Sequence, residues 1–269
     1  MKTRSLLWVG IGSFIAFLIA TAPIASIYPR IAPPGSPLQL TGLSGSVFSG
    51  SAGSLSYQGR SLAKPLNWTF SPLALIAARL GFHINGSVDG LLFDGHVSRT
   101  LGGNIVVSSL AASGGLKGLL ALSGDAQLPI DGDVGVKLEE LILVEKFPKQ
   151  ASADIDIVRL RWTLGRNPLV LGDFKMVVTT EAGVIVAKVS PTGGPLDVGG
   201  ELRLNTDRSY EIDLKVKAKP EAEPAVQNLV RTLGQPDTQG YYRIKSRAQL
   251  YAAPISHGIR TSHHRRLRR

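Results

Sequence analysis

The sequence predicts a mainly β protein, in which one N-terminal transmembrane helix precedes a curved, largely antiparallel β-sheet domain with two short helices. The first observation is that no charged residue lies between Arg4 and Arg30. The second is a series of short runs after residue 37, such as residues 82–88 and 210–217, in which apolar and polar residues alternate. This period is typical of strands with one solvated face. The third is a composition with 30 glycines, 16 prolines and 6% aromatic residues, which favours strands and turns.

The N-terminal apolar stretch is predicted to be a membrane anchor over residues 6–28. It exceeds the roughly 20 residues that cross the hydrocarbon core of a bilayer, and Trp8 and Tyr28 stand near its ends, where aromatic rings prefer the interface. Lys2 and Arg4 precede it. The positive-inside rule therefore leaves residues 1–5 in the cytoplasm and the rest of the chain outside it.

A cleaved signal peptide is the alternative interpretation of the same stretch. Ala20-Thr21-Ala22 resembles the small-residue cleavage site of such peptides. The apolar run is longer than the usual signal-peptide region of about 7–15 residues, and Pro23 follows the site directly. The anchor is therefore the favoured interpretation.

Three segments follow the anchor. Residues 29–37, PRIAPPGSP, are predicted to be a stiff proline-rich spacer. Residues 38–252 contain the alternating runs and form the β-rich domain. Its stretch from 43 to 55, LSGSVFSGSAGSL, keeps apolar residues at regular positions, which predicts a strand with a bulge or bend. Residues 253–269 form a basic tail, expected to be solvated and disordered; an electrostatic tether to anionic lipid or an acidic surface is the alternative.

Two segments depart from the β pattern. Ser71-Pro72 followed by LALIAARLG has a cap, a proline at the first helical position and a terminal glycine, which predicts a short helix ending at Gly81. Residues 223–234 place apolar residues at helical spacing and end at a glycine, which predicts an amphipathic helix.

The charge distribution argues against a nucleic-acid partner. The formal net charge is +10, but eight of the 30 Lys and Arg residues lie near the N-terminus and in the tail, leaving 22 against 20 acidic residues. A nearly neutral body offers no basic face for a phosphate backbone.

No constellation of residues predicts catalysis. The chain has no cysteine, no G-x-S-x-G and neither glycine-rich phosphate motif. Asp131-Gly-Asp133 begins like a calcium loop but departs from its spacing. We therefore expect no catalytic residues, no cofactor and no metal, and a protein that is not an enzyme.

Several short motifs follow one another in order over roughly residues 38–250. They are residues 40–52, 66–68, 71–73, 128–134, 160–162, 193–204 and 229–244. Together they resemble type II secretion system protein N of Gram-negative bacteria. Two departures are Phe48, where a tryptophan is expected, and the arginine-rich tail.

The resemblance implies an inner-membrane protein that spans the membrane once, with its cytoplasmic N-terminus and a periplasmic β-rich domain. It would be a non-enzymatic accessory or scaffold subunit of the apparatus that exports folded proteins across the outer membrane. Its partners would be other secretion subunits in the inner membrane and periplasm. The alternative is a lipid-binding or lipid-transfer protein of the envelope, which would use an open apolar β groove.

Nine residues are structural or interaction candidates. Gly42, Gly45 and Gly50 are expected to let the first strand bend. Trp68 and Trp162 are candidate core or interface anchors, because large rings bury much area.

The other four candidates lie near the C-terminal end of the domain. Gly234, Pro236, Asp237 and Gly240 are expected to shape the turn from the last helix into the last strand.

Overall fold

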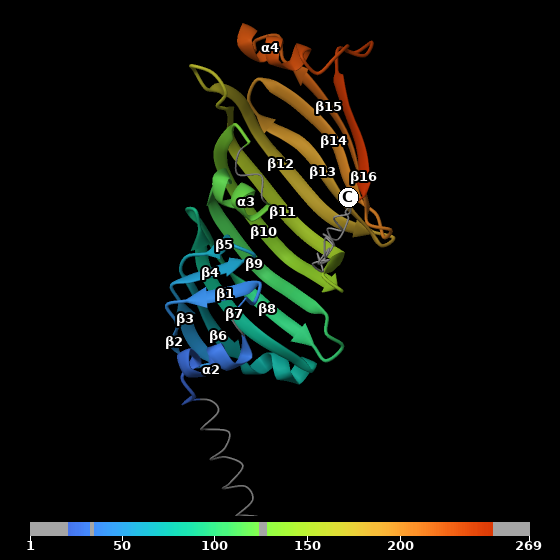
Figure 1. Cartoon of the computed structure of the whole chain (residues 1–269). Coiled ribbons are helices and arrows are strands. Elements are labelled where there is room, and N and C mark those ends of the chain that lie inside the picture. The colour runs from blue at the N-terminus through green and yellow to red at the C-terminus, as the bar shows by residue number, and fades with distance from the viewer. Residues whose placement is uncertain (1–20, 33–34, 124–127, 250–269) are drawn as a thin grey trace, which may run out of the picture.

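In the computed structural model, residues 21–32, 35–123 and 128–249 are described. One long antiparallel sheet of 13 strands dominates this part of the chain, and a 3-stranded sheet lies against it (Figure 1). The predicted mainly β fold with a largely antiparallel sheet is therefore confirmed. Among the described residues, no helix is long and apolar enough to cross a membrane. The expected anchor lies mostly outside the described residues, and the tail lies wholly outside them.

The large sheet is a meander from β6 onward, since each strand pairs with the next along the chain. Only β2 and β3 precede this series. In spatial order its strands are β2 (Ser44–Gly45), β3 (Ser49–Ala52), β6 (Leu66–Ser71), β7 (Arg79–Val88), β8 (Leu91–Thr100), β9 (Ile105–Gly115), β10 (Ile130–Val144), β11 (Phe147–Trp162), β12 (Leu169–Glu181), β13 (Val184–Gly193), β14 (Leu196–Leu204), β15 (Ser209–Ala218) and β16 (Tyr242–Gln249).

The small sheet consists of β1 (Leu38–Thr41), β4 (Ser54–Tyr57) and β5 (Arg60–Ala63), in the order β1-β4-β5. The chain therefore leaves the large sheet after β3 and returns to it at β6. The stretch 43–55 was predicted to be one bent strand, and this was wrong. It forms β2, β3 and the start of β4, because Gly53 makes the turn at which the chain changes sheet.

Four helical segments are described. They are α2 (Ile24–Ile31), the 3₁₀ helix η1 (Pro72–Ala77), α3 (Leu116–Ser123) and α4 (Pro224–Arg231). The C-terminal amphipathic helix was predicted correctly. The segment after Ser71 is a 3₁₀ helix that ends at Ala78 with φ +52, so Gly81 belongs to β7 and not to a helix end. Helix α3 was not predicted, and the helix predicted over residues 6–28 covers only the first part of α2.

Helix α2 crosses the expected boundary between the anchor and the spacer. It includes Pro29 and begins after Pro23, whose backbone forms an isolated bridge with Ser46 beside β2. The hydroxyl of Tyr28 donates a hydrogen bond to the carbonyl oxygen of Leu38 at 3.0 Å and accepts one from the amide of Leu40 at 2.9 Å. These bonds tie α2 to the small sheet.

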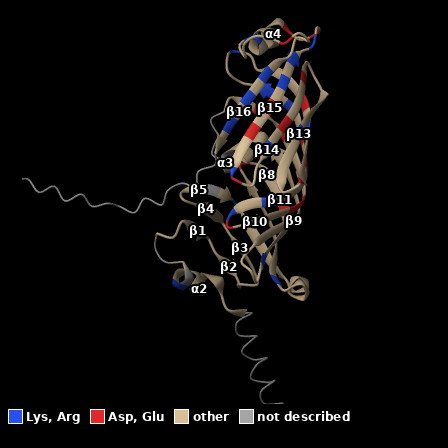
Figure 2. Cartoon of the chain, turned by 90° about the vertical axis from the view of Figure 1, so that its right-hand side faces the viewer, with Lys and Arg blue, Asp and Glu red and all other residues tan. Residues whose placement is uncertain are grey.

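The core lies on one face of the large sheet, which we call the inner face because Phe93, Val136 and Ile157 point from it toward the covering elements. Two clusters of buried apolar residues occupy this face, one under α3 and one under α4, and they share Ile157 and Leu160. The opposite, outer face carries exposed charged pairs such as Lys175–Asp154 at 3.1 Å, and Figure 2 shows charged residues along the strands toward β16. The sheet is thus apolar on one side and charged on the other, as the period-two pattern predicts.

Candidate functional site

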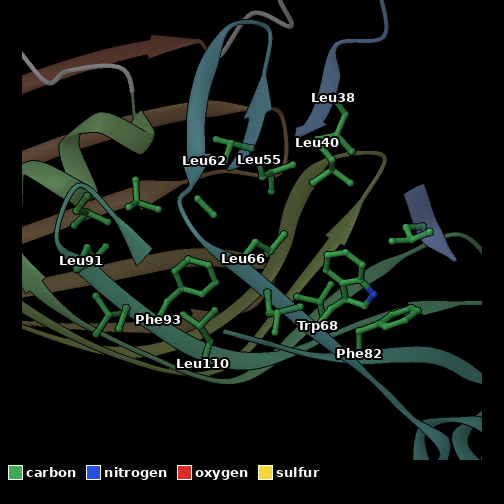
Figure 3. A pocket seen from close by; sticks show the side chains of 18 of the residues that line it. Leu38, Leu40, Leu55, Leu62, Leu66, Trp68, Phe82, Leu91, Phe93 and Leu110 are labelled. Carbon is green, nitrogen blue, oxygen red and sulfur yellow. The ribbon is translucent and has the colours of Figure 1, made fainter. Parts of the chain in front are cut away.

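An apolar cavity of about 750 Å³ lies between the two sheets. This volume falls within the range of small-molecule sites, about 300–1,000 Å³. Figure 3 shows the side chains that line it, and all of the lining residues are apolar. Those labelled there are Leu38, Leu40, Leu55, Leu62, Leu66, Trp68, Phe82, Leu91, Phe93 and Leu110.

The floor of the cavity is the inner face of β6 to β10. Alternation along each strand sends every second side chain to this face, so Phe82 and Ile84 of β7 and Phe93 and Val97 of β8 line the cavity. Their neighbours face the other way: His83 and His96 pair on the outer face with ring centroids 4.8 Å apart.

The small sheet forms the roof, and two helices close the ends. Leu40 and Leu55 occupy paired positions on β1 and β4, and Leu55 pairs in turn with Ala63 of β5. Ile24 of α2 and Leu119 of α3 complete the lining. The lining side chains carry one hydrogen-bonding group, the indole N–H of Trp68, and this group already donates to a backbone carbonyl.

Trp68 is one of the predicted candidate residues, and its indole is held in place. Its Nε1 donates a hydrogen bond to the carbonyl oxygen of Val47 at 3.1 Å. The ring lies over Gly50, its register partner on β3, where an added Cβ would stand 2.6 Å from Trp68 Cζ2. Only glycine at position 50 therefore leaves space for this ring.

The other two predicted N-terminal glycines lie in turns near the same corner of the domain. Gly42 follows β1 and has φ +63, whereas Gly45 ends β2 with φ +81. Both values lie in the left-handed region that favours glycine. Gly42 lies where the chain passes from the small sheet to the large one, and Gly45 lies at the reversal between β2 and β3 of the large sheet.

Trp162 lies in the second cluster, far along the sheet from Trp68. It packs, partly buried, against the buried residues under α4, where Val226 and Val230 are 1% and 3% exposed. Tyr242 of β16 contacts the same cluster. The structure therefore places the two predicted tryptophans at two different ends of the inner face and does not bring them together.

The last four predicted candidates lie in the segment between α4 and β16. Asp237 is its centre: its carboxylate accepts hydrogen bonds from the amides of Gln239 and Tyr241, both at 2.9 Å. These two hydrogen bonds lower the pKa of Asp237, and the bond from the amide of Tyr241 has the larger effect. Gly240 has φ +81 and donates its amide to the carbonyl of Asp237 at 2.9 Å.

Gly234 and Pro236 stand at the start of this segment. Gly234 lies three residues after the end of α4 and has φ +127, a value that favours glycine. The turn is stabilised by its own backbone and by Asp237, and it directs the chain into the edge strand β16.

The titratable side chains of the described residues lie mostly at the surface. Among the described residues, no group of three His, Asp or Glu side chains is arranged to hold a metal ion. Several acidic groups form ion pairs on the outer face, such as Asp131 with Arg161 at 3.1 Å. His83 lies 3.0 Å from Asp94 on the same outer face.

Sequence analysis missed most of the cavity. The alternation of apolar and polar residues identified the strands that hold Phe82, Phe93 and Leu110. The same alternation occurs whether an apolar side chain packs against another side chain or lines a cavity. The sequence feature that marks the roof is Gly53, at which the chain passes from the large sheet to the small sheet.

Comparison with known proteins identifies the family of the chain. Residues 36–245 match the family model described as type II secretion system (T2SS), protein N. The chain is 26% identical to type II secretion system protein N of Vibrio cholerae serotype O1, over 90% of this chain and 98% of that protein. It is 21% identical to the protein of the same name from Aeromonas hydrophila, over 88% of this chain and 95% of that protein. No solved structure matches the chain significantly. The chain belongs to the type II secretion system protein N family.

Proposed function

We propose that this chain is a non-enzymatic accessory subunit of the type II secretion apparatus, anchored in the inner membrane, with the β domain in the periplasm. In that position it contributes to the export of folded proteins across the outer membrane. The family match over residues 36–245 carries the proposal, because it spans nearly all of the β domain. The uncharged stretch before α2 supports the anchor.

The free edge of β16 supports a scaffold role. Within the described residues β16 pairs only with β15, along eight positions from Tyr242 to Gln249. The opposite edge of the sheet, β2, is only two residues long. A long unpaired strand edge accepts a strand from another protein through its free backbone groups.

The side chains of β16 indicate what kind of strand would pair with it. Arg243, Lys245 and Arg247 alternate along its outer face, and across the pairing they meet only two acids, Asp213 and Glu211. A second copy paired edge to edge would set these cations against one another, which is unfavourable. The partner strand is therefore expected to carry acidic residues at alternate positions.

A secretion assay tests this proposed function. In a strain that lacks the gene, a folded exoprotein is expected to accumulate in the periplasm, and the full chain is expected to restore its export. A complementing variant with Lys245→Gln and Arg247→Gln is expected to restore export less well at equal abundance in the membrane. Undiminished export in the deletion strain would contradict the proposed function, whereas full rescue by the variant would contradict only the role of the β16 edge.

A second candidate function is the binding of a lipid acyl chain in the apolar cavity. The volume of about 750 Å³ and the apolar lining support it, because each buried methylene group contributes about 0.8 kcal/mol of binding free energy. The uncharged lining has no partner for a headgroup, so a headgroup would remain outside.

Two neighbouring alanines of β9 offer a matched test of lipid binding. Ala112 lies on the inner face and lines the cavity, whereas Ala111 is exposed on the outer face. Lipid that copurifies with the full chain is measured by mass spectrometry after gentle extraction. Ala112→Phe is expected to reduce it and Ala111→Phe to leave it unchanged. Equal lipid in both variants would show that the cavity is not the binding site.

A further inference from the structure

Five large apolar side chains are exposed around one end of the β7–β8 pair. Three belong to η1, where Leu73, Leu75 and Ile76 are 75%, 56% and 85% exposed. The others are Leu80, near the start of β7, and Leu101, which is 90% exposed in the turn after β8. We call these five residues the η1 patch.

Register places the members of the patch close together. Leu80 pairs with Arg99, and Arg79 pairs with Thr100, so Leu101 follows directly beside the end of η1. Gly81 lets η1 lie against the sheet, since an added Cβ there would stand 2.6 Å from the Cβ of Ala74. The patch therefore surrounds one end of the β7–β8 pair: η1 lies on the outer side, which Gly81 faces, and Leu80 alternates with Gly81 and points to the inner side.

The charged residues on the segments that carry the patch are of one sign. The sequence contains no Asp or Glu before Asp89, and none occurs in the turn between β8 and β9. Arg79 and Arg99 flank the patch, and neither forms an ion pair within the described part of the chain. Exposed apolar side chains with basic residues beside them are typical of surfaces that lie in a membrane interface.

The patch lies at the end of the domain where the described chain begins. Pro23, just before α2, bridges Ser46, which adjoins β2, and β2 and β3 lead across the sheet to β6. Strand β6 runs directly into η1. Two strand spacings of about 4.8 Å separate β2 from β6. Figure 1 shows α2 at the same end of the molecule as β2, β3 and β6.

We propose that the η1 patch is a second membrane contact, with which the β domain lies on the surface of an anionic phospholipid bilayer. This inference rests on the proposed anchor, whose uncharged stretch ends in α2 and so brings this end of the domain to the bilayer. The apolar side chains enter the boundary between headgroups and acyl chains, about 5–10 Å deep. Arg79 and Arg99 meet the lipid phosphates.

A lipid surface suits this patch better than a protein surface. The five apolar side chains lie on three separate segments, on both sides of a strand end. A second copy would place the arginines of one patch against those of the other. A bilayer can surround a strand end on both sides and attracts the positive charge.

Depth measurements with spin labels test this contact. The chain has no cysteine, so single labels can be placed by Ile76→Cys and Leu101→Cys in the full chain, reconstituted in vesicles of phosphatidylethanolamine and phosphatidylglycerol. Matched controls are Leu92→Cys and Leu164→Cys, whose native side chains are 62% and 67% exposed near the other ends of the strands. Collision rates with molecular oxygen and with a water-soluble nickel complex are measured at each site.

Labels at positions 76 and 101 are expected to collide with oxygen and be protected from nickel, with a ratio several-fold higher than at the two controls. Equal ratios at all four sites would overturn the η1 contact. Flotation of the vesicles after an alkaline wash tests the anchor separately. If the chain floats with the vesicles but its patch labels are exposed to water, the anchor is supported and the η1 contact is contradicted. If the wash releases the chain although its labels were protected beforehand, the η1 contact is supported and the anchor is contradicted.

Discussion

The indole of Trp68 lies directly over Gly50, and the two residues occupy paired positions on adjacent strands. An added Cβ at position 50 would approach Trp68 Cζ2 to 2.6 Å and the carbonyl oxygen of Ser44 to 2.6 Å. Since Trp68 also lines the cavity, this close approach links the conformation of the first hairpin to the shape of the candidate lipid site.

Gly50→Ala is therefore expected to destabilise the domain by about 1–3 kcal/mol, the range for overpacking, and to shift the fluorescence of Trp68. The measurement is urea-induced unfolding of the full chain in detergent. Gly135→Ala is the control, because a Cβ at position 135 meets nothing within 4 Å. A Gly50→Ala protein as stable as the control would show that the indole moves aside freely.

Tyr28 is expected to stabilise the roof of the cavity through its hydroxyl group. Tyr28→Phe leaves the partly buried amide of Leu40 without this acceptor, and a buried unsatisfied group costs about 1–3 kcal/mol. Hydrogen exchange at Leu40 is expected to accelerate. Tyr57→Phe, in the same small sheet, is the control, and comparable acceleration in both variants would contradict the role of the Tyr28 hydroxyl.

Helix α4 is expected to depend on Val226, which is 1% exposed. Val226→Ala removes most of the roughly 1.5–3 kcal/mol that a buried valine contributes and leaves a small cavity. Asn228→Ala, on the exposed side of the same helix, is expected to change the free energy of unfolding by less than about 0.5 kcal/mol. Equal losses in the two variants would mean that α4 does not dock through its apolar face.

The stability of the β16 edge is expected to depend on pH through Asp213. The hydrogen bond from Arg243 is the main cause of the lowered pKa of Asp213, with Nε at 2.7 Å and NH2 at 2.6 Å from its two oxygens. A carboxyl group whose pKa is lowered by folding stabilises the folded state above its unfolded pKa of about 3.9. That contribution disappears as the pH falls through the lower folded pKa.

The measurement for this pair is the urea midpoint of unfolding between about pH 6 and pH 2. Asp207, Asp237 and Glu181 also have lowered pKa values, so the wild-type slope contains their contributions. Asp213→Asn and Arg243→Gln are each expected to reduce the acid-induced loss relative to the wild type. An unchanged pH profile in both variants would show that the pair contributes nothing.

Much of the fold could be predicted from the sequence, because its strands have one apolar and one solvated face. Runs such as Tyr210–Ala218 alternate with period two, and helix α4 carries apolar residues at helical spacing. These local patterns identify the type of each element. They also identify Asp237 and Gly240 as turn residues.

The arrangement between elements could not be predicted. Gly53 and its neighbours carry the chain from one sheet to another, but glycine in a strand pattern is equally compatible with a bulge. The segment from Pro72 to Gly81 was predicted to be a helix, without any indication that Leu73 and Ile76 would remain exposed. Whether an apolar side chain is covered depends on contacts between segments far apart in the chain, and no local period encodes them.

The most direct test of the proposed scaffold role is in vivo photo-crosslinking from Lys245, on the free edge strand, compared with Lys175, an outer-face lysine in the middle of the sheet. Adducts are identified by mass spectrometry. Our account predicts that position 245 captures another subunit of the secretion apparatus and that position 175 captures far less of it. Phospholipid adducts alone at position 245, or equal capture at the two positions, would contradict a partner that binds at the β16 edge.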